Sequence, residues 1–85
     1  MELADWRSKI DKLDDQIVRI LNERAAAAIA IGQLKAKAGA PIYEPQREQA
    51  VIEHVKQANP GPLTAAQVQE IYERLMDVMR ALQRP

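Results

Sequence analysis

The 85-residue chain contains no cysteine, no phenylalanine, and only three glycines and one tryptophan. Without cysteine, neither a disulfide framework nor a thiolate metal site can stabilise the fold, and nothing calls for an oxidising compartment. A chain of this length buries only about 60–65% of the surface that its unfolded form exposes. Its stability must come from packing, and its own core is thin unless another chain adds to it.

The sequence also lacks long apolar runs and an excess of one charge. Apolar residues make up 47% of it, but no run approaches the ~20 residues that cross a bilayer, and the N-terminus does not have the layout of a signal peptide. Twelve basic and twelve acidic residues are interspersed, without the basic stripe typical of nucleic-acid binders. We expect a cytoplasmic protein that binds neither nucleic acid nor a membrane.

Several kinds of catalytic signature are missing too. There is no serine, cysteine and histidine constellation, no glycine-rich phosphate loop and no cluster of metal ligands. The single histidine, His54, lies among charged residues on a face that we expect to be solvated, and a catalytic role is not indicated. The sequence therefore favours chemistry by binding, orientation and electrostatics, with no metal and no cofactor.

What the chain does contain is apolar residues at helical spacing. From residue 1 to residue 40 they recur at three- and four-residue steps without a proline, which predicts one long helix over residues 5–38. Asp5 could cap its start, and Gly39 suits the left-handed position just past its end. Pro41 would block continuation of the helix.

Two shorter helices follow in the same pattern. Pro45 suits a first helical turn, so a second helix is predicted over residues 44–58, ended by the segment 59–62 with its two prolines. Thr64 and Gln67 have the spacing of a capping box and predict a third helix over residues 64–83. We expect one all-α domain over residues 1–85.

The predicted first helix is too long for a compact monomer. It would span about 50 Å at ~1.5 Å per residue, whereas a domain of this size has a diameter of about 30 Å. An apolar stripe on the overhang favours a second copy packed through a two-fold interface, which predicts an intertwined homodimer. The alternative is a break near residues 22–25 that gives a monomeric four-helix bundle, but no glycine or proline marks a turn there.

Two cationic residues interrupt the apolar stripe of this helix. Arg24 and Lys35 are eleven residues apart, so they point the same way, about 16 Å apart along the axis. Burying an unpaired cation is costly, so something negative must meet them. The partner could be a small anionic ligand or an internal carboxylate from Glu44, Glu48 or Asp77, unless the side chains reach solvent.

Further polar residues border the inward faces of the other helices. Arg47 lies one turn before Val51, and Glu48 occupies the next position on the same helix. Gln83 continues the apolar line of the third helix with an amide donor, although it could also be part of a frayed end. Together with the two cations above, these residues are mostly hydrogen-bond donors, and they predict a site for a small dianion.

Arg7 behaves differently from these residues. It points about 100° away from Arg24 and lies roughly 25 Å from it along the axis, so the two cannot share a pocket within one chain. In an antiparallel dimer of long helices, however, Arg7 would reach the site of the partner chain. The alternative is an ordinary surface arginine.

At this point the sequence resembles the all-α chorismate mutases in their short bacterial domain form. The similarity runs from Trp6 to Gln83 and is carried by Arg7, Ile10, Leu13, Asp14, the run 21–24, Ile31, Gly32, Lys35 and above all the run 41–48. The resemblance implies a three-helix protomer, an intertwined homodimer with two sites, and the rearrangement of chorismate to prephenate on the shikimate pathway to phenylalanine and tyrosine. It implies no cofactor.

The resemblance also assigns the residues that would act on chorismate. Arg24 and Arg7 of the partner chain would bind the two substrate carboxylates and select the reactive conformer. Lys35 and Gln83 would donate to the ether oxygen, on which negative charge grows in the transition state. A glutamine at position 83 cannot titrate, which predicts activity that persists through neutral pH.

The remaining site residues follow from the same resemblance. Glu48 would accept a hydrogen bond from the ring hydroxyl, the Glu44 backbone would contact the same group, and Arg47 would orient this acidic pair. Glu44 replaces a common aspartate, and Met79 stands where many bacterial members carry a serine that helps to hold a carboxylate. The methionine predicts a raised Michaelis constant with intact chemistry.

Two further interpretations stay open. Isochorismate pyruvate lyases and aminochorismate mutases are similar proteins with the same fold that act on close analogues of chorismate. From a different class, the chain could be a non-catalytic helical dimerisation module or a regulatory domain of a larger enzyme. A pure dimerisation helix would gain stability from leucine in place of Arg24 and Lys35, which argues for a ligand.

Overall fold

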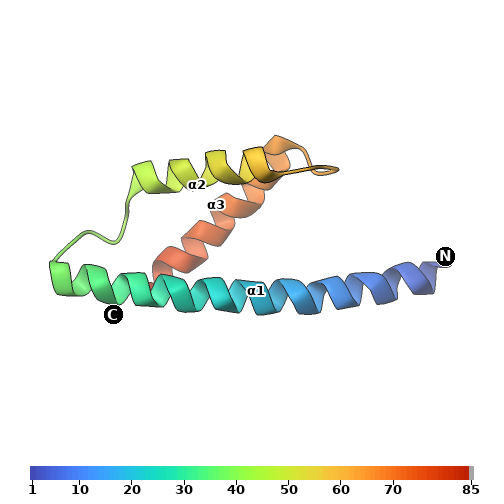
Figure 1. Ribbon diagram of the computed structural model, residues 1–85, viewed down its shortest axis with the longest axis horizontal. Helices are drawn as coiled ribbons and strands as arrows, with labels where there is room; N and C mark the ends of the chain where they lie inside the picture. The colour runs from blue at the N-terminus through green and yellow to red at the C-terminus, as the bar shows by residue number, and fades with distance from the viewer. Residues whose placement is uncertain (85) are drawn as a thin grey trace.

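The computed structural model describes residues 1–84, so Pro85, the last residue of the expected domain, lies outside the described residues. Three helices follow one another along the chain: α1 (Leu3–Ala38), α2 (Pro45–Ala58) and α3 (Ala65–Leu82) (Figure 1). Residues 1–84 contain no strand. The all-α, three-helix architecture predicted from the sequence is confirmed.

The ends of α1 differ in how well the sequence predicted them. The prediction that Asp5 is the N-cap is wrong, because the helix begins at Leu3 with Glu2 at the cap. The Asp5 carboxylate instead accepts a hydrogen bond from the Glu2 backbone N–H at 2.8 Å, which satisfies a donor just before the first turn. At the other end Gly39 has a left-handed backbone with φ 66°, as predicted.

The other two helices begin where the capping signals indicated. Pro45 is the first residue of α2, where its missing N–H costs no helical hydrogen bond. Thr64 caps α3, because its hydroxyl accepts from the Gln67 N–H at 3.1 Å while the Gln67 side chain accepts from the Thr64 N–H at 3.0 Å. α3 ends at Leu82, so Gln83 is its C-cap and not its last helical residue.

α1 runs the full length of the molecule, whose principal extents are 54 × 23 × 16 Å. α3 crosses between the other two helices and packs against both, while the N-terminal half of α1 extends past them (Figure 1). The helix is continuous through residues 22–25, so the alternative of a broken first helix and a four-helix bundle is wrong. No helix within residues 1–84 is long and apolar enough to span a membrane.

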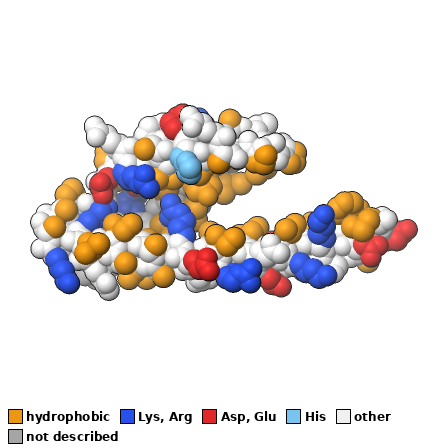
Figure 2. Space-filling view, in the orientation of Figure 1, with side chains coloured by type: hydrophobic (Ala, Val, Ile, Leu, Met, Phe, Trp, Pro, Cys, Tyr) orange, Lys and Arg blue, Asp and Glu red, His pale blue; other side chains and the backbone are white. Residues whose placement is uncertain are grey.

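The core of the single chain is small. Its buried apolar residues are Ala28, Ile52, Val68, Met76 and Met79. By contrast, the apolar stripe of the α1 overhang is about half exposed: Trp6 49%, Ile10 55%, Leu13 44% and Ile17 51%. Figure 2 shows apolar side chains along the side of the overhang that faces the open space beside α2 and α3. Monomeric globular proteins rarely expose large contiguous apolar patches.

Candidate functional site

A cavity of about 470 Å³ opens between the C-terminal half of α1, the start of α2 and the end of α3. Lysine and arginine side chains gather at this opening (Figure 2). Seven residues singled out from the sequence line the cavity: Arg24, Lys35, Glu44, Arg47, Glu48, Met79 and Gln83. Arg7, the eighth, is exposed on the overhang and does not line it, as the geometry of one helix requires.

Lys35 lies at one end of the cavity and has three oxygen partners. Its amino group donates to the Ile42 carbonyl at 2.8 Å and to the Gln83 side-chain oxygen at 3.1 Å, and it lies 2.7 Å from a Glu44 carboxylate oxygen. Three acceptors match the three protons of an ammonium group. The internal salt bridge considered from the sequence is therefore present at Lys35, with Glu44 as the partner.

Gln83 is held in place on both its side chain and its backbone. Its amide oxygen accepts from Lys35, so its NH₂ group keeps both hydrogens for another acceptor. Its backbone lies against Gly32 of α1, where a β-carbon would be only 2.8 Å from the Gln83 Cα and carbonyl oxygen. The missing side chain at Gly32 lets the end of α3 approach α1 closely enough for the Lys35–Gln83 contact.

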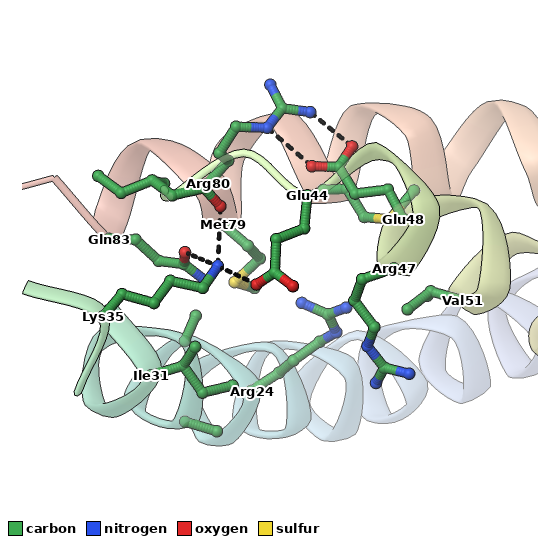
Figure 3. A pocket seen from close by; sticks show the side chains of 14 residues that line it. Arg24, Ile31, Lys35, Glu44, Arg47, Glu48, Val51, Met79, Arg80 and Gln83 are labelled. Carbon is green, nitrogen blue, oxygen red and sulfur yellow. Dashed lines mark hydrogen bonds and ion pairs between the residues drawn. The ribbon is translucent and has the colours of Figure 1, made fainter. Parts of the chain in front are cut away.

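Arg24 and Arg47 lie at the other end of the cavity from Lys35 and Gln83 (Figure 3). Within residues 1–84, the three salt bridges join Lys35 to Glu44 and Arg80 to Glu48 and Asp77, and none involves Arg24 or Arg47. The internal carboxylate considered for Arg24 is therefore not found in the described chain.

One site residue was missed by the sequence reasoning. Arg80 of α3 lines the cavity, and its Nε and Nη2 donate to the two oxygens of Glu48 at 2.8 and 2.6 Å. Its hydrogen bond to Glu48 is the main cause of a pKa raised above the usual arginine value, so the guanidinium is charged at any pH of interest. The signal was available, because Arg80 lies one turn after Met76 on the inward line of α3.

This ion pair corrects one expectation. Arg47 was expected to orient Glu44 and Glu48, but the salt bridges of these carboxylates go to Lys35 and Arg80 instead. Arg47 lines the same cavity without such a pair among the described residues. The contribution of Arg47 to the cavity is therefore its positive charge.

The charges that line the cavity do not cancel. Arg24, Lys35, Arg47 and Arg80 face only two carboxylates, those of Glu44 and Glu48, which leaves a formal excess of two positive charges. Cavities with convergent donors and an apolar floor are typical small-molecule sites. No group of three or more potential metal-ligating side chains occurs within residues 1–84. The arrangement suits a small organic dianion.

The fold and the cavity define a class of all-helical proteins in which a long first helix and two shorter helices enclose a cationic pocket. Comparison with known sequences identifies the family, because the profile described as chorismate mutase type II matches residues 6–84. The chain belongs to the chorismate mutase type II family.

Individual relatives agree with this assignment. The chain is 43% identical over 83 residues to a bifunctional chorismate mutase/prephenate dehydratase of Neisseria gonorrhoeae, a match that covers 98% of this chain and 22% of that protein. The first four relatives compared are bifunctional proteins of this kind, of which the chain spans only 16 to 24%. A chorismate mutase of Methanocaldococcus jannaschii is 33% identical over 55 residues, covering 65% of this chain and 56% of that one.

Solved structures show the same fold. A chorismate mutase of Thermus thermophilus superposes with a TM-score of 0.93 at 26% identity, covering 95% of this chain and 92% of that one. A chorismate mutase of Helicobacter pylori in complex with prephenate superposes with a TM-score of 0.87 at 28% identity, covering 95% and 88%.

Proposed function

We propose that this chain catalyses the rearrangement of chorismate to prephenate. The observation that carries the proposal is the cavity itself, with two excess positive charges and the Lys35–Gln83 donor pair at one end. Chorismate is a small dianion, and a family relative has been crystallised with prephenate. The bifunctional relatives combine chorismate mutase with prephenate dehydratase, which supports a place in aromatic amino-acid biosynthesis.

The proposed reaction is pericyclic, so the ether bond breaks as a carbon–carbon bond forms within one molecule. It needs no nucleophile and no proton transfer, only a substrate held in the compact reactive conformer. Arg24 would bind one substrate carboxylate as a charge-assisted pair, and Arg7 of the partner chain would bind the other. Arg47 would add positive potential close to them, since it has no salt bridge of its own within residues 1–84.

Lys35 and Gln83 would donate to the ether oxygen. The hydrogen bond between them leaves the Gln83 NH₂ group with both of its hydrogens, and the Ile42 carbonyl limits the motion of the Lys35 amino group. Because negative charge grows on the ether oxygen, these donors would bind the transition state more tightly than the substrate. Losing one such preorganised donor typically costs ~3 kcal/mol or more of activation free energy.

Glu48 would accept a hydrogen bond from the ring hydroxyl, and the Glu44 backbone would contact the same group. An ionised carboxylate has about four lone-pair positions, so Glu48 keeps acceptor capacity beside its two bonds from Arg80. The Glu44 carboxylate has a different contact, because it lies 2.7 Å from the Lys35 amino group and neutralises its charge. Substrate would have to displace it.

We propose in addition that the active form is an intertwined homodimer. The exposed apolar stripe of the overhang, which includes Trp6, Ile10 and Ile17, would be covered by a second copy. Arg7 lies on the same overhang, roughly 25 Å along the α1 axis from Arg24, so only a partner chain could bring it to the cavity. A single protomer would therefore hold an incomplete site.

The test is to incubate the purified chain with chorismate and, separately, with isochorismate, and to identify the products. Prephenate from chorismate, abolished in Lys35→Ala but not in the matched variant Lys37→Ala, would support the proposal, because Lys37 is an exposed lysine on the same helix. Salicylate and pyruvate from isochorismate would assign the chain to the lyases. Inertness toward both substrates would leave a binding or regulatory module.

A further inference from the structure

Arg80 is the one cavity cation to which the proposed mechanism gives no task. We propose that Arg80 is a positioning residue, which holds the Glu48 carboxylate in the orientation that receives the ring hydroxyl of the substrate. This inference rests on the proposed function and adds to it a residue that acts only through Glu48.

Arg80 and Glu48 form a bidentate salt bridge, which fixes the orientation of the carboxylate as well as neutralising its charge. Two N–H groups of one guanidinium meet the two oxygens of one carboxylate, at 2.8 and 2.6 Å. Bidentate pairs of this kind define the plane and the rotation of the carboxylate, which a point charge such as lysine does not. Both side chains are largely shielded, with about a quarter of each exposed, so solvent screens the pair only partly.

Arg80 is itself held by other groups, so it can serve as a rigid support. Its Nη2 lies 3.3 Å from an Asp77 oxygen one turn earlier on α3, and its guanidinium carbon lies 4.7 Å from the centre of the Tyr43 ring. The stacked ring and the second carboxylate restrict a side chain that otherwise has many rotamers. Through Glu48 and Tyr43, Arg80 thus connects α3 with the start of α2 and with the segment that precedes it.

The position of Arg80 argues against direct contact with substrate. In Figure 3 its guanidinium lies beside the Glu48 carboxylate and points away from Lys35 and Arg24. A glutamate without this support would be free to rotate toward Lys35 or Arg47, both of which line the same cavity. Holding Glu48 on the α3 side keeps the cations of the cavity available for the substrate.

The experiment is a double-mutant cycle in the full chain, with kcat/KM for chorismate as the readout. The variants are Arg80→Met, Glu48→Gln and the two together, and Arg74→Met is the control because Arg74 is an exposed arginine on the same helix. We expect Arg80→Met to lose about tenfold to a hundredfold in kcat/KM, and Arg80→Lys to recover only part of it. In the Glu48→Gln background, Arg80→Met should cost less than about a further twofold.

A purely structural role predicts a different pattern. Arg80→Met would then lower the melting temperature and would multiply the loss caused by Glu48→Gln, which would overturn the inference. Equal activities of Arg80→Met and Arg74→Met would overturn it too. So would an Arg80→Met variant more active than the unmodified chain, since Arg80 would then keep Glu48 away from the substrate. If the unmodified chain does not convert chorismate, the proposed function itself fails and the inference falls with it.

Discussion

Gly32 of α1 and Gln83 of α3 lie in backbone contact, so close that a β-carbon on Gly32 would stand 2.8 Å from the Gln83 Cα. The same approach brings the Gln83 amide to 3.1 Å from the Lys35 amino group. The geometry of the proposed donor pair therefore depends on a residue that carries no functional group.

We predict that Gly32→Ala lowers both stability and activity. Alanine favours a helix by about 1 kcal/mol over glycine, but the added methyl group meets backbone atoms, and overpacking costs about 1–3 kcal/mol. Displacing Gln83 should lower kcat/KM by about tenfold or more. The measurements are thermal unfolding and chorismate kinetics, with Ala30→Ser as a control that adds one atom on the exposed face. Unchanged kinetics would show that the close approach does not set the donor geometry.

Replacing Glu44 should strengthen substrate binding. Its carboxylate lies 2.7 Å from the Lys35 amino group and would compete with the substrate for that cation. The Glu44 side chain is 48% exposed, which limits the pair to about 0.2–1 kcal/mol, so Glu44→Gln should lower KM by at most about fivefold with little change in kcat. Glu53→Gln, at an exposed position of α2, controls for the change in net charge. A raised KM would mean that the Glu44 side chain helps to bind chorismate.

Met79 is buried, at 6% exposure, and forms part of the apolar lining of the cavity. Met79→Ser would supply the hydroxyl that many bacterial members have there, so we expect a lower KM. Truncating a buried methionine should also cost about 2–4 kcal/mol of unfolding free energy. Met79→Ala creates a similar void without the hydroxyl, so the difference in KM between the two variants isolates the effect of the hydroxyl group. Equal or weaker binding in the serine variant would overturn the prediction.

The amide at Gln83 should make catalysis insensitive to acid–base titration. A glutamine donates at every pH, so kcat should stay nearly constant between about pH 5 and 7. In Gln83→Glu the side chain can donate only while protonated, so activity should fall as pH rises through the pKa of the new carboxyl group. A pH profile of kcat for both proteins checks this. A sharp loss in the unmodified chain over the same range would contradict the role of Gln83.

Periodicity and capping signals were enough to predict most of the fold. Thr64 with Gln67, Pro45 and Gly39 each form the local structure that their chemistry favours. The start of α1 was placed too late. An aspartate can serve either as the N-cap of a helix or as the N3 residue that accepts a hydrogen bond from the N-cap backbone, and the sequence around Asp5 does not distinguish the two.

The site was predicted less completely, for a physical reason. Helical spacing identifies an inward face but does not tell which long side chain on it finds which partner. Arg80 lies on the inner side of α3, which its spacing from Met76 indicates, but only the structure shows that its partner is Glu48 of α2. The role of Gly32 likewise depends on where α3 crosses α1, which no local pattern contains.

The central claim is that chorismate is rearranged in a cavity completed by Arg7 of a second chain, and subunit complementation tests it most directly. Arg7→Ala and Lys35→Ala would each be assayed alone, then unfolded, mixed in equal amounts and refolded together. We expect each variant to lose about a hundredfold or more in kcat/KM, because each lacks a group that binds a developing or full negative charge.

Mixed dimers would contain one site with both residues intact and one site lacking both. Half of the dimers formed at random are mixed, so the mixture should recover about a quarter of the prephenate-forming activity of the unmodified chain. Each variant refolded alone serves as the baseline. A mixture no more active than its components, or an unmodified chain that forms no prephenate, would contradict the account.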